Sequence, residues 1–153
     1  MVKARAVDGF SKTCGAHKIG KQFLSAARKV VREAAELERQ GITKYKKMTE
    51  RTLEVLLMRS LPKVLIKKGI VANQVPDGNQ KVADIALSSS NHVKGGMVIE
   101  LKKDDAKSQL KGEVQLKGYM STGSTKYKYG MLLVFPGVKP DEKKVWAQYY
   151  QRP

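Results

Sequence analysis

Three charged residues near the middle of the chain, Asp84, Glu100 and Lys102, are of the types that carry out chemistry on phosphate esters. Asp84 is the only acid in an apolar stretch, and Glu100 and Lys102 are two positions apart in another. Residues two apart on a strand share a face, so Glu100 and Lys102 are expected to project together. If the two stretches pair as a hairpin, Asp84 can reach the same face as Glu100.

The two carboxylates predict a site for a divalent cation. Carboxylates placed side by side repel each other unless a cation lies between them. Asp84, Glu100 and the main-chain carbonyl of Leu101 would form an oxygen cluster, which suits Mg²⁺ or Mn²⁺. Lys102 would lie beside the metal, where it could orient an attacking water or stabilise charge on the phosphate. A solvated pair of charges on a sheet face gives the same pattern, so the surrounding elements matter.

The composition predicts a polyanionic partner. The chain has 153 residues, and 30 Lys and Arg against 14 Asp and Glu give a net charge of +16. Such an excess on one domain favours nucleic acid, with acidic lipid or acidic protein as alternatives. The single cysteine, Cys14, excludes an intramolecular disulfide and a four-cysteine zinc site. Because no apolar run is long enough for a membrane span and no signal peptide is recognisable, we expect no membrane partner and an intracellular location.

The spacing of apolar residues predicts an α/β fold. Steps of three and four indicate a helix over residues 18–40, and a second helix begins at Glu50 after the N-cap candidate Thr49. Pro62 is expected to kink or split that helix. Strands are predicted over 70–75, 81–88, 97–103 and 129–135, with a helix over 104–121 and a short last strand over 145–150. This order indicates a mixed sheet of four to five strands flanked by helices.

These segments resemble the PD-(D/E)xK nuclease superfamily, whose fold is restriction-endonuclease-like. The stretch VADIAL carries the first acid, Asp84, although Ala83 replaces the proline of the family's name, and VIELKK supplies the ExK pair. The stretch QLKGY at residues 115–119 resembles the QxxxY motif of RecB-like members. The resemblance implies that Gln115 supports the metal or its water and that Tyr119 contacts the substrate.

The resemblance also implies an acid on the helix before the sheet. The stretch ERTL at residues 50–53 is similar to the ERxL of archaeal junction resolvases, so Glu50 is expected to support the metal. Glu54, one turn further along, is the alternative. The resemblance covers about residues 49–136 and implies metal-dependent hydrolysis of phosphodiester bonds without a covalent intermediate.

Four lysines on or near the helix after the ExK pair are predicted to contact phosphates, although a solvated helix face is the alternative for them. They are Lys103, Lys107, Lys111 and Lys117. Leu110 and Val114 on this helix, together with Leu116 and Met120, are expected to face the sheet.

The chain is expected to form one nuclease domain with four parts. Residues 1–16 are predicted to be a mobile basic arm and 17–48 a helical extension, which could clamp nucleic acid or form a homodimer. Residues 49–136 would form the nuclease-like core, and 137–153 a C-terminal strand and tail. We expect a Mg²⁺-dependent nuclease that acts on DNA rather than RNA, as an endonuclease. An exonuclease, a branched-DNA resolvase, a domain of a longer protein and a non-catalytic nucleic-acid-binding module remain open.

Overall fold

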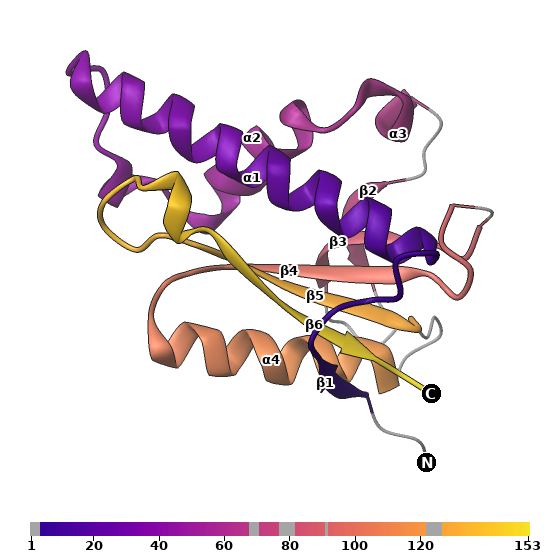
Figure 1. The fold of residues 1–153 in the computed structure, drawn as a ribbon. Helices are drawn as coiled ribbons and strands as arrows, with labels where there is room; N and C mark the ends of the chain where they lie inside the picture. The colour runs from indigo at the N-terminus through magenta and orange to yellow at the C-terminus, as the bar shows by residue number, and fades with distance from the viewer. Residues whose placement is uncertain (1–3, 68–70, 77–81, 91, 122–126) are drawn as a thin grey trace.

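The computed structural model describes residues 4–67, 71–76, 82–90, 92–121 and 127–153. They form a mixed α/β fold in which helices cover both faces of one sheet (Figure 1). The elements are β1 (Arg5–Val7), α1 (Gly15–Arg39), η1 (Tyr45–Lys47), α2 (Glu50–Ser60), α3 (Lys63–Lys67), β2 (Ala72–Pro76), β3 (Val82–Leu87), β4 (Met97–Lys103), α4 (Ala106–Ser121), β5 (Tyr129–Phe135), η2 (Glu142–Lys144) and β6 (Trp146–Gln151).

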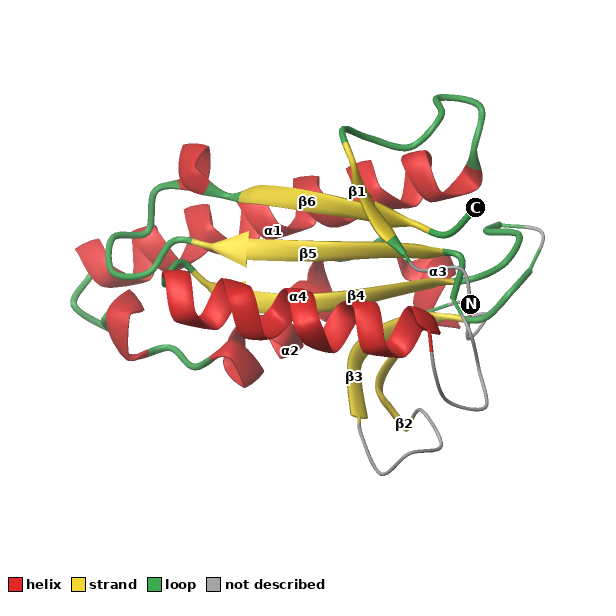
Figure 2. Cartoon of the chain, turned by 90° about the horizontal axis from the view of Figure 1, so that it is seen from below, coloured by secondary structure: helices red, strands yellow, loops and turns green. Residues whose placement is uncertain are grey.

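The described sheet has six strands in the order β1-β6-β5-β4-β3-β2, one more than the upper limit predicted from the sequence. Only β4 and β5 are parallel among these neighbours, as expected for two strands that are joined by a helix. Helices α1, α2 and α3 lie on one face, and α4 lies on the other (Figures 1 and 2). The α/β class predicted from the sequence is confirmed.

The central strands hold the two hydrophobic layers together. Every residue of β5 is buried, as its apolar sequence YGMLLVF predicts for a strand that is covered on both faces. In β4, Ile99 and Leu101 pack into the layer beneath α1 and α2, while Val98 packs into the layer beneath α4. Alternate residues of β4 therefore face opposite layers, which places Glu100 and Lys102 on the same side as Val98.

The sequence signals at Thr49 and Pro62 are confirmed. The Thr49 side chain accepts a hydrogen bond from the Thr52 main-chain N–H, so Thr49 is the N-cap of α2. Gly41 follows α1 with a φ of 73°, a left-handed conformation that glycine adopts readily. Pro62 separates α2 from α3 because it cannot donate the main-chain hydrogen bond that a continuous helix needs.

The predicted inner face of α4 was wrong for Leu110 and Val114 and is confirmed for Leu116 and Met120. Leu110 and Val114 are each 64% exposed, whereas Leu116 and Met120 are buried against the sheet. The buried face includes Gly112, where an added Cβ would lie 2.8 Å from the Leu132 Cδ1 atom. Because the first half of the helix packs on the sheet through a glycine, the apolar residues Leu110 and Val114 did not indicate which side of that half is buried.

The predicted mobile arm was also wrong for the residues that are described there. Strand β1 pairs antiparallel with β6, and Phe10 is buried. The Phe10 ring makes edge-to-face contacts with Tyr129 and Tyr149, with ring centroids 5.1 and 5.0 Å apart. A three-residue strand and one aromatic anchor have no periodicity, so the sequence did not indicate that this segment packs.

We predict that Phe10→Ala lowers the free energy of unfolding by about 3 kcal/mol, because it removes a buried ring and leaves a cavity. Phe10→Leu should lose less, since it keeps most of the buried volume. Urea denaturation followed by circular dichroism measures both. An unchanged stability in Phe10→Ala would mean that the arm does not pack on the sheet in solution.

Candidate active site

Asp84 and Glu100 lie where the regular pairing of β3 with β4 ends. The register pairs residues 85–87 of β3 with 97–99 of β4, and the next position brings Asp84 opposite Glu100. At this position the carboxylates of Asp84 and Glu100 accept the hydrogen bonds that main-chain carbonyls accept in a regular ladder. The Leu101 N–H donates to Asp84 Oδ2 at 2.9 Å, and the Asp84 N–H donates to Glu100 Oε1 at 3.3 Å. Each carboxylate thus holds the main chain of the opposite strand with one oxygen.

Burial and repulsion act together on Glu100. Glu100 is 2% exposed. Its burial is the main cause, and the charge of Asp84 the second, of a rise in the pKa of its carboxyl to about 9. Lys102 opposes this rise only weakly. The sequence-based expectation that Asp84 and Glu100 are neighbours is therefore met in the geometry, and their proximity disfavours two negative charges.

The Lys102 side chain reaches from β4 to Glu50 at the start of α2. Its side chain is 12% exposed, and its Nζ atom lies 3.8 Å from Glu50 Oε2. Its stem packs beneath α4, because a Cβ added to Gly112 would lie 2.9 Å from the Lys102 Cγ atom. The glycine leaves the space through which Lys102 extends, so helix packing fixes the position of the ammonium group.

Glu50 and Glu54, the two alternatives for the helix acid, have different environments. Glu54 is 1% exposed and accepts hydrogen bonds from the side chains of Arg51, Asn73 and Gln74. It ties α2 to β2, and it holds Gln74, whose φ of 54° is unusual for a residue other than glycine. Glu54 therefore has a structural role.

The Glu50 carboxylate has an oxygen that is buried and unsatisfied. Glu50 Oε2 has no hydrogen-bond partner among the described residues, although Lys102 lies nearby. Burial raises the pKa of Glu50, and the charge of Lys102 lowers it. A buried oxygen without a donor is typical of a place where a water molecule or a cation binds. The geometry thus favours Glu50 over Glu54 as the acid that is open to a ligand.

A small cavity of about 200 Å³ lies among residues of α2, β2, β3 and β4. Its lining includes two residues that the sequence did not single out, Arg51 and Gln74. Both are exposed polar residues. Arg51 lies within the ERTL stretch, which assigned a role only to Glu50, and Gln74 lies in no motif, so only the fold brings it to the site. The described residues that line the cavity are Glu50, Arg51, Glu54, Gln74, Asp84 and Lys102.

The two residues of the QxxxY-like motif differ in their surroundings. The Tyr119 ring is buried, and its hydroxyl donates to the Val82 main-chain oxygen at 2.9 Å, which holds α4 against β3. This hydrogen bond gives Tyr119 a structural role, and its contact with the substrate stays a prediction. Gln115 Oε1 is buried and has no hydrogen-bond partner among the described residues, as for Glu50 Oε2.

The four lysines that were predicted to contact phosphates fall into two groups. The Lys103 ammonium donates to the main-chain oxygens of Tyr45 at 3.2 Å and Met48 at 2.9 Å, so it fixes η1. Lys117 forms an ion pair with Glu113 at 3.0 Å. Two remain exposed on α4 without an ion pair among the described residues, namely Lys107 and Lys111. Of these, Lys111 is near enough to lower the pKa of Glu50.

The donor set fits a hard divalent cation that keeps part of its water shell. Asp84 and Glu100 each use one oxygen on the main chain and have a second one. The orphaned Glu50 Oε2 belongs to a residue that lines the same cavity as Asp84, where it can accept a hydrogen bond from a metal-bound water. The N–H of Leu101 points to Asp84, and the carbonyl of a strand residue points to the same side as its N–H. Within the described residues, no three His, Cys, Asp or Glu side chains gather closely enough to hold a metal ion by themselves. Mg²⁺ commonly binds to one or two carboxylates and several waters.

Comparisons with known proteins do not identify a family for this chain. No protein-family model matches the chain, and no curated protein gives a significant match. Among solved structures, the chain is similar to one described as "Crystal structure of SSO0001", with a TM-score of 0.43 and 19% identity. The alignment covers 86% of this chain and 66% of that one. None of the described helices is long and apolar enough to span a membrane.

We predict that the stability of the metal-free protein depends on pH through Glu100. Because the folded-state pKa of this acid is raised from its ordinary 4.5 to about 9, the fold prefers the neutral form. Its contribution is complete below about pH 4.5 and is lost as the pH rises towards 9. Glu100→Gln stays neutral, so in EDTA it should be more stable than wild type at pH 8 and nearly equal to it at pH 5.

Urea denaturation between pH 5 and pH 9 tests this, with Glu33→Gln on the exposed side of α1 as the control. Parallel stability curves for wild type and Glu100→Gln would contradict the buried position of Glu100 beside Asp84.

We also predict opposite effects for two glycine substitutions in α4. Gly112→Ala should destabilise the protein by about 1–3 kcal/mol, because its Cβ would clash with Lys102 and Leu132. Gly118→Ala is the matched control, since its Cβ would meet nothing within 4 Å, and it should stabilise the helix by up to about 1 kcal/mol. Thermal denaturation measures both. If Gly112→Ala were as stable as Gly118→Ala, the close packing of Lys102 under α4 would be wrong.

Proposed function

We propose that this chain is a metal-dependent nuclease of the PD-(D/E)xK type that hydrolyses phosphodiester bonds in DNA, as an endonuclease. The observation that carries the proposal is the position of Asp84 and Glu100, which face each other at the end of the β3–β4 pairing with Lys102 on the same strand. Strands β3 and β4 are followed by helix α4, and this order and the spacing of the three residues resemble the arrangement in the PD-(D/E)xK superfamily. The net charge of +16 supports a nucleic-acid substrate.

In this proposal Asp84, Glu100 and the Leu101 carbonyl hold Mg²⁺ or Mn²⁺, and Glu50 and Gln115 hold its water shell. When bound, such a cation polarises the phosphoryl oxygen and favours formation of a nucleophile from water. Both Glu50 and Gln115 present a buried oxygen without a hydrogen-bond partner in the described part of the chain, as acceptors for ordered water would. Their oxygens can accept hydrogen bonds from water and so fix its orientation.

Lys102 acts on the water and on the phosphate. Its ammonium group is confined by α4 and lies near Glu50, so it is held in place before substrate binds. A fixed cation that faces the position where negative charge develops stabilises the transition state without reorganisation during the reaction. Lys102 also donates hydrogen bonds, which can orient the attacking water towards phosphorus.

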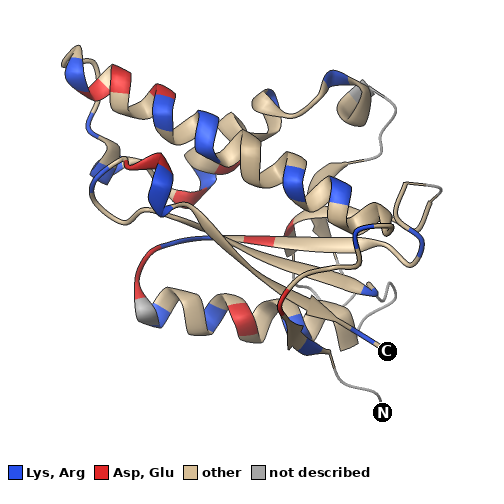
Figure 3. Ribbon diagram, in the orientation of Figure 1, with Lys and Arg blue, Asp and Glu red and all other residues tan. Residues whose placement is uncertain are grey.

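The charge distribution around the site is compatible with this role. Figure 3 shows Lys and Arg along α1, on α4 and on the segment between α1 and α2, while the acid of β4 lies within the sheet. Exposed lysines and arginines attract the phosphate backbone, while buried acids can bind a cation.

A non-catalytic nucleic-acid-binding module is the second candidate. The observation that favours it is that Asp84 and Glu100 each accept a main-chain hydrogen bond across the strands, which is a structural use of the carboxylates. In that case the charge of +16 would still produce binding, but no metal would be needed. Cleavage that depends on a divalent cation separates the two candidates.

We predict that wild type cleaves DNA with Mg²⁺ and not with EDTA, and that Lys102→Ala reduces kcat by about a hundredfold or more. The DNA affinity of Lys102→Ala should change by less than about twofold, because 29 other Lys and Arg residues remain (30 less one). Linear, circular, single-stranded and four-way-junction DNA are the substrates for this assay, and RNA is the comparison. Lys94→Ala, which removes an exposed lysine, is the control.

Cleavage by Lys102→Ala at the wild-type rate would remove Lys102 from the mechanism. Binding of DNA by wild type without cleavage of any substrate in Mg²⁺ or Mn²⁺ would support the non-catalytic module. Cleavage that is restricted to DNA ends, to junctions or to RNA would instead replace the endonuclease or DNA assignment within the same fold.

A further inference from the structure

A basic hollow of about 660 Å³ lies between the segment that links α1 to α2 and the loop after β5. We call it the basic groove. One wall carries Ile42, Lys44, Lys46 and Lys47, and the other carries Val138 and Lys139. Three of the four lysines come from one short stretch around η1, and the fourth, Lys139, follows β5. None of the four forms an ion pair within the described part of the chain.

The walls of the basic groove are anchored by buried contacts. The Tyr45 hydroxyl donates to the Pro136 main-chain oxygen at 2.6 Å, which ties η1 to the end of β5. Lys103, at the end of β4, donates to the oxygens of Tyr45 and Met48. Since Tyr45 is fully buried between exposed lysines, η1 is fixed to the sheet while its charges remain in solvent. The lysines therefore project from a rigid base.

Glu38 is the only acid that lines the basic groove in the described structure, and its carboxylate already accepts a hydrogen bond. Its Oε1 atom accepts a hydrogen bond from the Tyr45 N–H at 3.1 Å. Glu38 thus shapes the groove, and four lysines against one acid leave a net charge of +3 in the lining. Ile42 and Val138 are each 65% exposed on opposite walls, so the groove also offers apolar surface.

A short stretch of chain before α2 joins the basic groove to the candidate active site. Lys47 is three residues before Glu50, so the two main-chain positions lie within about 10 Å of each other. Glu50 lines the site cavity and lies 3.8 Å from Lys102. A phosphate backbone that follows η1 would therefore reach the catalytic groups after a short distance.

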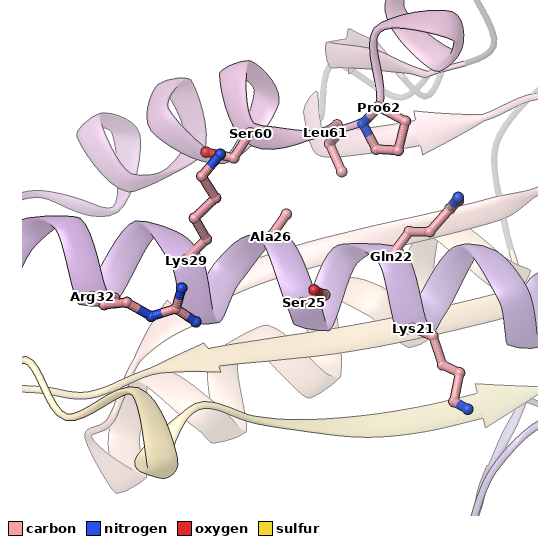
Figure 4. A pocket seen from close by; sticks show the side chains of 9 residues that line it. All are labelled: Lys21, Gln22, Ser25, Ala26, Lys29, Arg32, Ser60, Leu61 and Pro62. Atoms are coloured by element: carbon pink, nitrogen blue, oxygen red, sulfur yellow. The ribbon is translucent and has the colours of Figure 1, made fainter.

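A second cavity, between α1 and the end of α2, fits a phosphate backbone less well. Figure 4 shows that Lys29 extends towards Ser60, while Lys21 points to the opposite side of α1. Arg32 is engaged with Glu142 at 2.6 Å. Lys21 and Lys29 both line this cavity of about 480 Å³, but its lining shares no residue with that of the site cavity.

We propose that the basic groove binds the sugar–phosphate backbone of the nucleic-acid substrate and guides it into the site. This inference rests on the proposed function. The four lysines neutralise successive phosphates, and Ile42 and Val138 contact the apolar edges of the sugars. Such contacts are independent of sequence, so the groove supplies affinity and position rather than specificity.

The test compares two triple variants that remove the same charge. The groove variant is Lys44→Gln with Lys46→Gln and Lys47→Gln. The control is Lys18→Gln with Lys21→Gln and Lys29→Gln on the exposed face of α1. Each lowers the net charge from +16 to +13 by removing three lysines. Binding to a fluorescein-labelled 20-base-pair duplex is measured in EDTA by anisotropy over a range of salt concentrations, so no cleavage is required.

We expect the groove variant to bind at least about tenfold more weakly, with a slope of log affinity against log salt that is shallower by about 2 to 3. The control should change affinity by less than about threefold. Lys139→Gln, from the opposite wall, should make the slope shallower by about 0.9 on its own. Equal losses in the two triple variants, or a larger loss in the α1 control, would overturn the proposal.

Cleavage assays separate this proposal from the proposed function. If wild type binds through the groove but does not cleave, the nuclease assignment fails and the groove remains a binding surface. If wild type cleaves and the groove variant has an unchanged KM, the groove is not the substrate track. The groove variant should raise KM and keep kcat at saturating substrate, because its lysines do not contact the reacting atoms.

Discussion

The hydrogen bonds that Asp84 and Glu100 make across β3 and β4 are the constraint on which the site depends. At this point the regular pairing of the strands ends, and two carboxylates take over as acceptors for main-chain N–H groups. This arrangement binds the strands together, but it also places two acids close together in a buried environment. The burial of Glu100 and the charge of Asp84 both disfavour its ionised form. A bound cation would remove this conflict, since it stabilises both negative charges.

The helices around the sheet serve this centre in different ways. On one face, α4 approaches β4 closely at Gly112, and the missing side chain leaves room for the stem of Lys102. On the other, α2 supplies Glu50 to the cavity and uses Glu54 to hold β2. Lys103 fixes the segment before α2. Lys102 and Lys103 thus adjoin in sequence but act on opposite sides of β4, one at the site and one beneath the basic groove.

The sequence predicted the elements well, because their signals are local. The N-cap Thr49, the break at Pro62 and the apolar run of β5 each depend on residues within one segment. Alternation along two strands also sufficed to bring Asp84 and Glu100 together. The sequence did not reveal β1, because a short edge strand is stabilised by its partner β6 and by a single anchor, Phe10.

The roles of several polar residues could not be predicted, because they depend on packing between distant segments. The buried Tyr119 hydroxyl meets a carbonyl of β3, and the Lys103 ammonium meets two carbonyls of the segment before α2. Nothing in the local sequence distinguishes these residues from exposed ones. The role of Gly112 could not be predicted either, because this residue acts by lacking a side chain, which leaves room for Lys102.

The most direct test of the central claim is to locate a bound metal. Crystals grown with Mn²⁺, with data collected at a wavelength where manganese scatters anomalously, would show the position of the ion without any assumption about activity. We expect one anomalous peak in contact with carboxylate oxygens of both Asp84 and Glu100, and no such peak in crystals of Asp84→Asn. A wild-type structure with these two carboxylates in place and no peak between them at saturating Mn²⁺ would contradict the account.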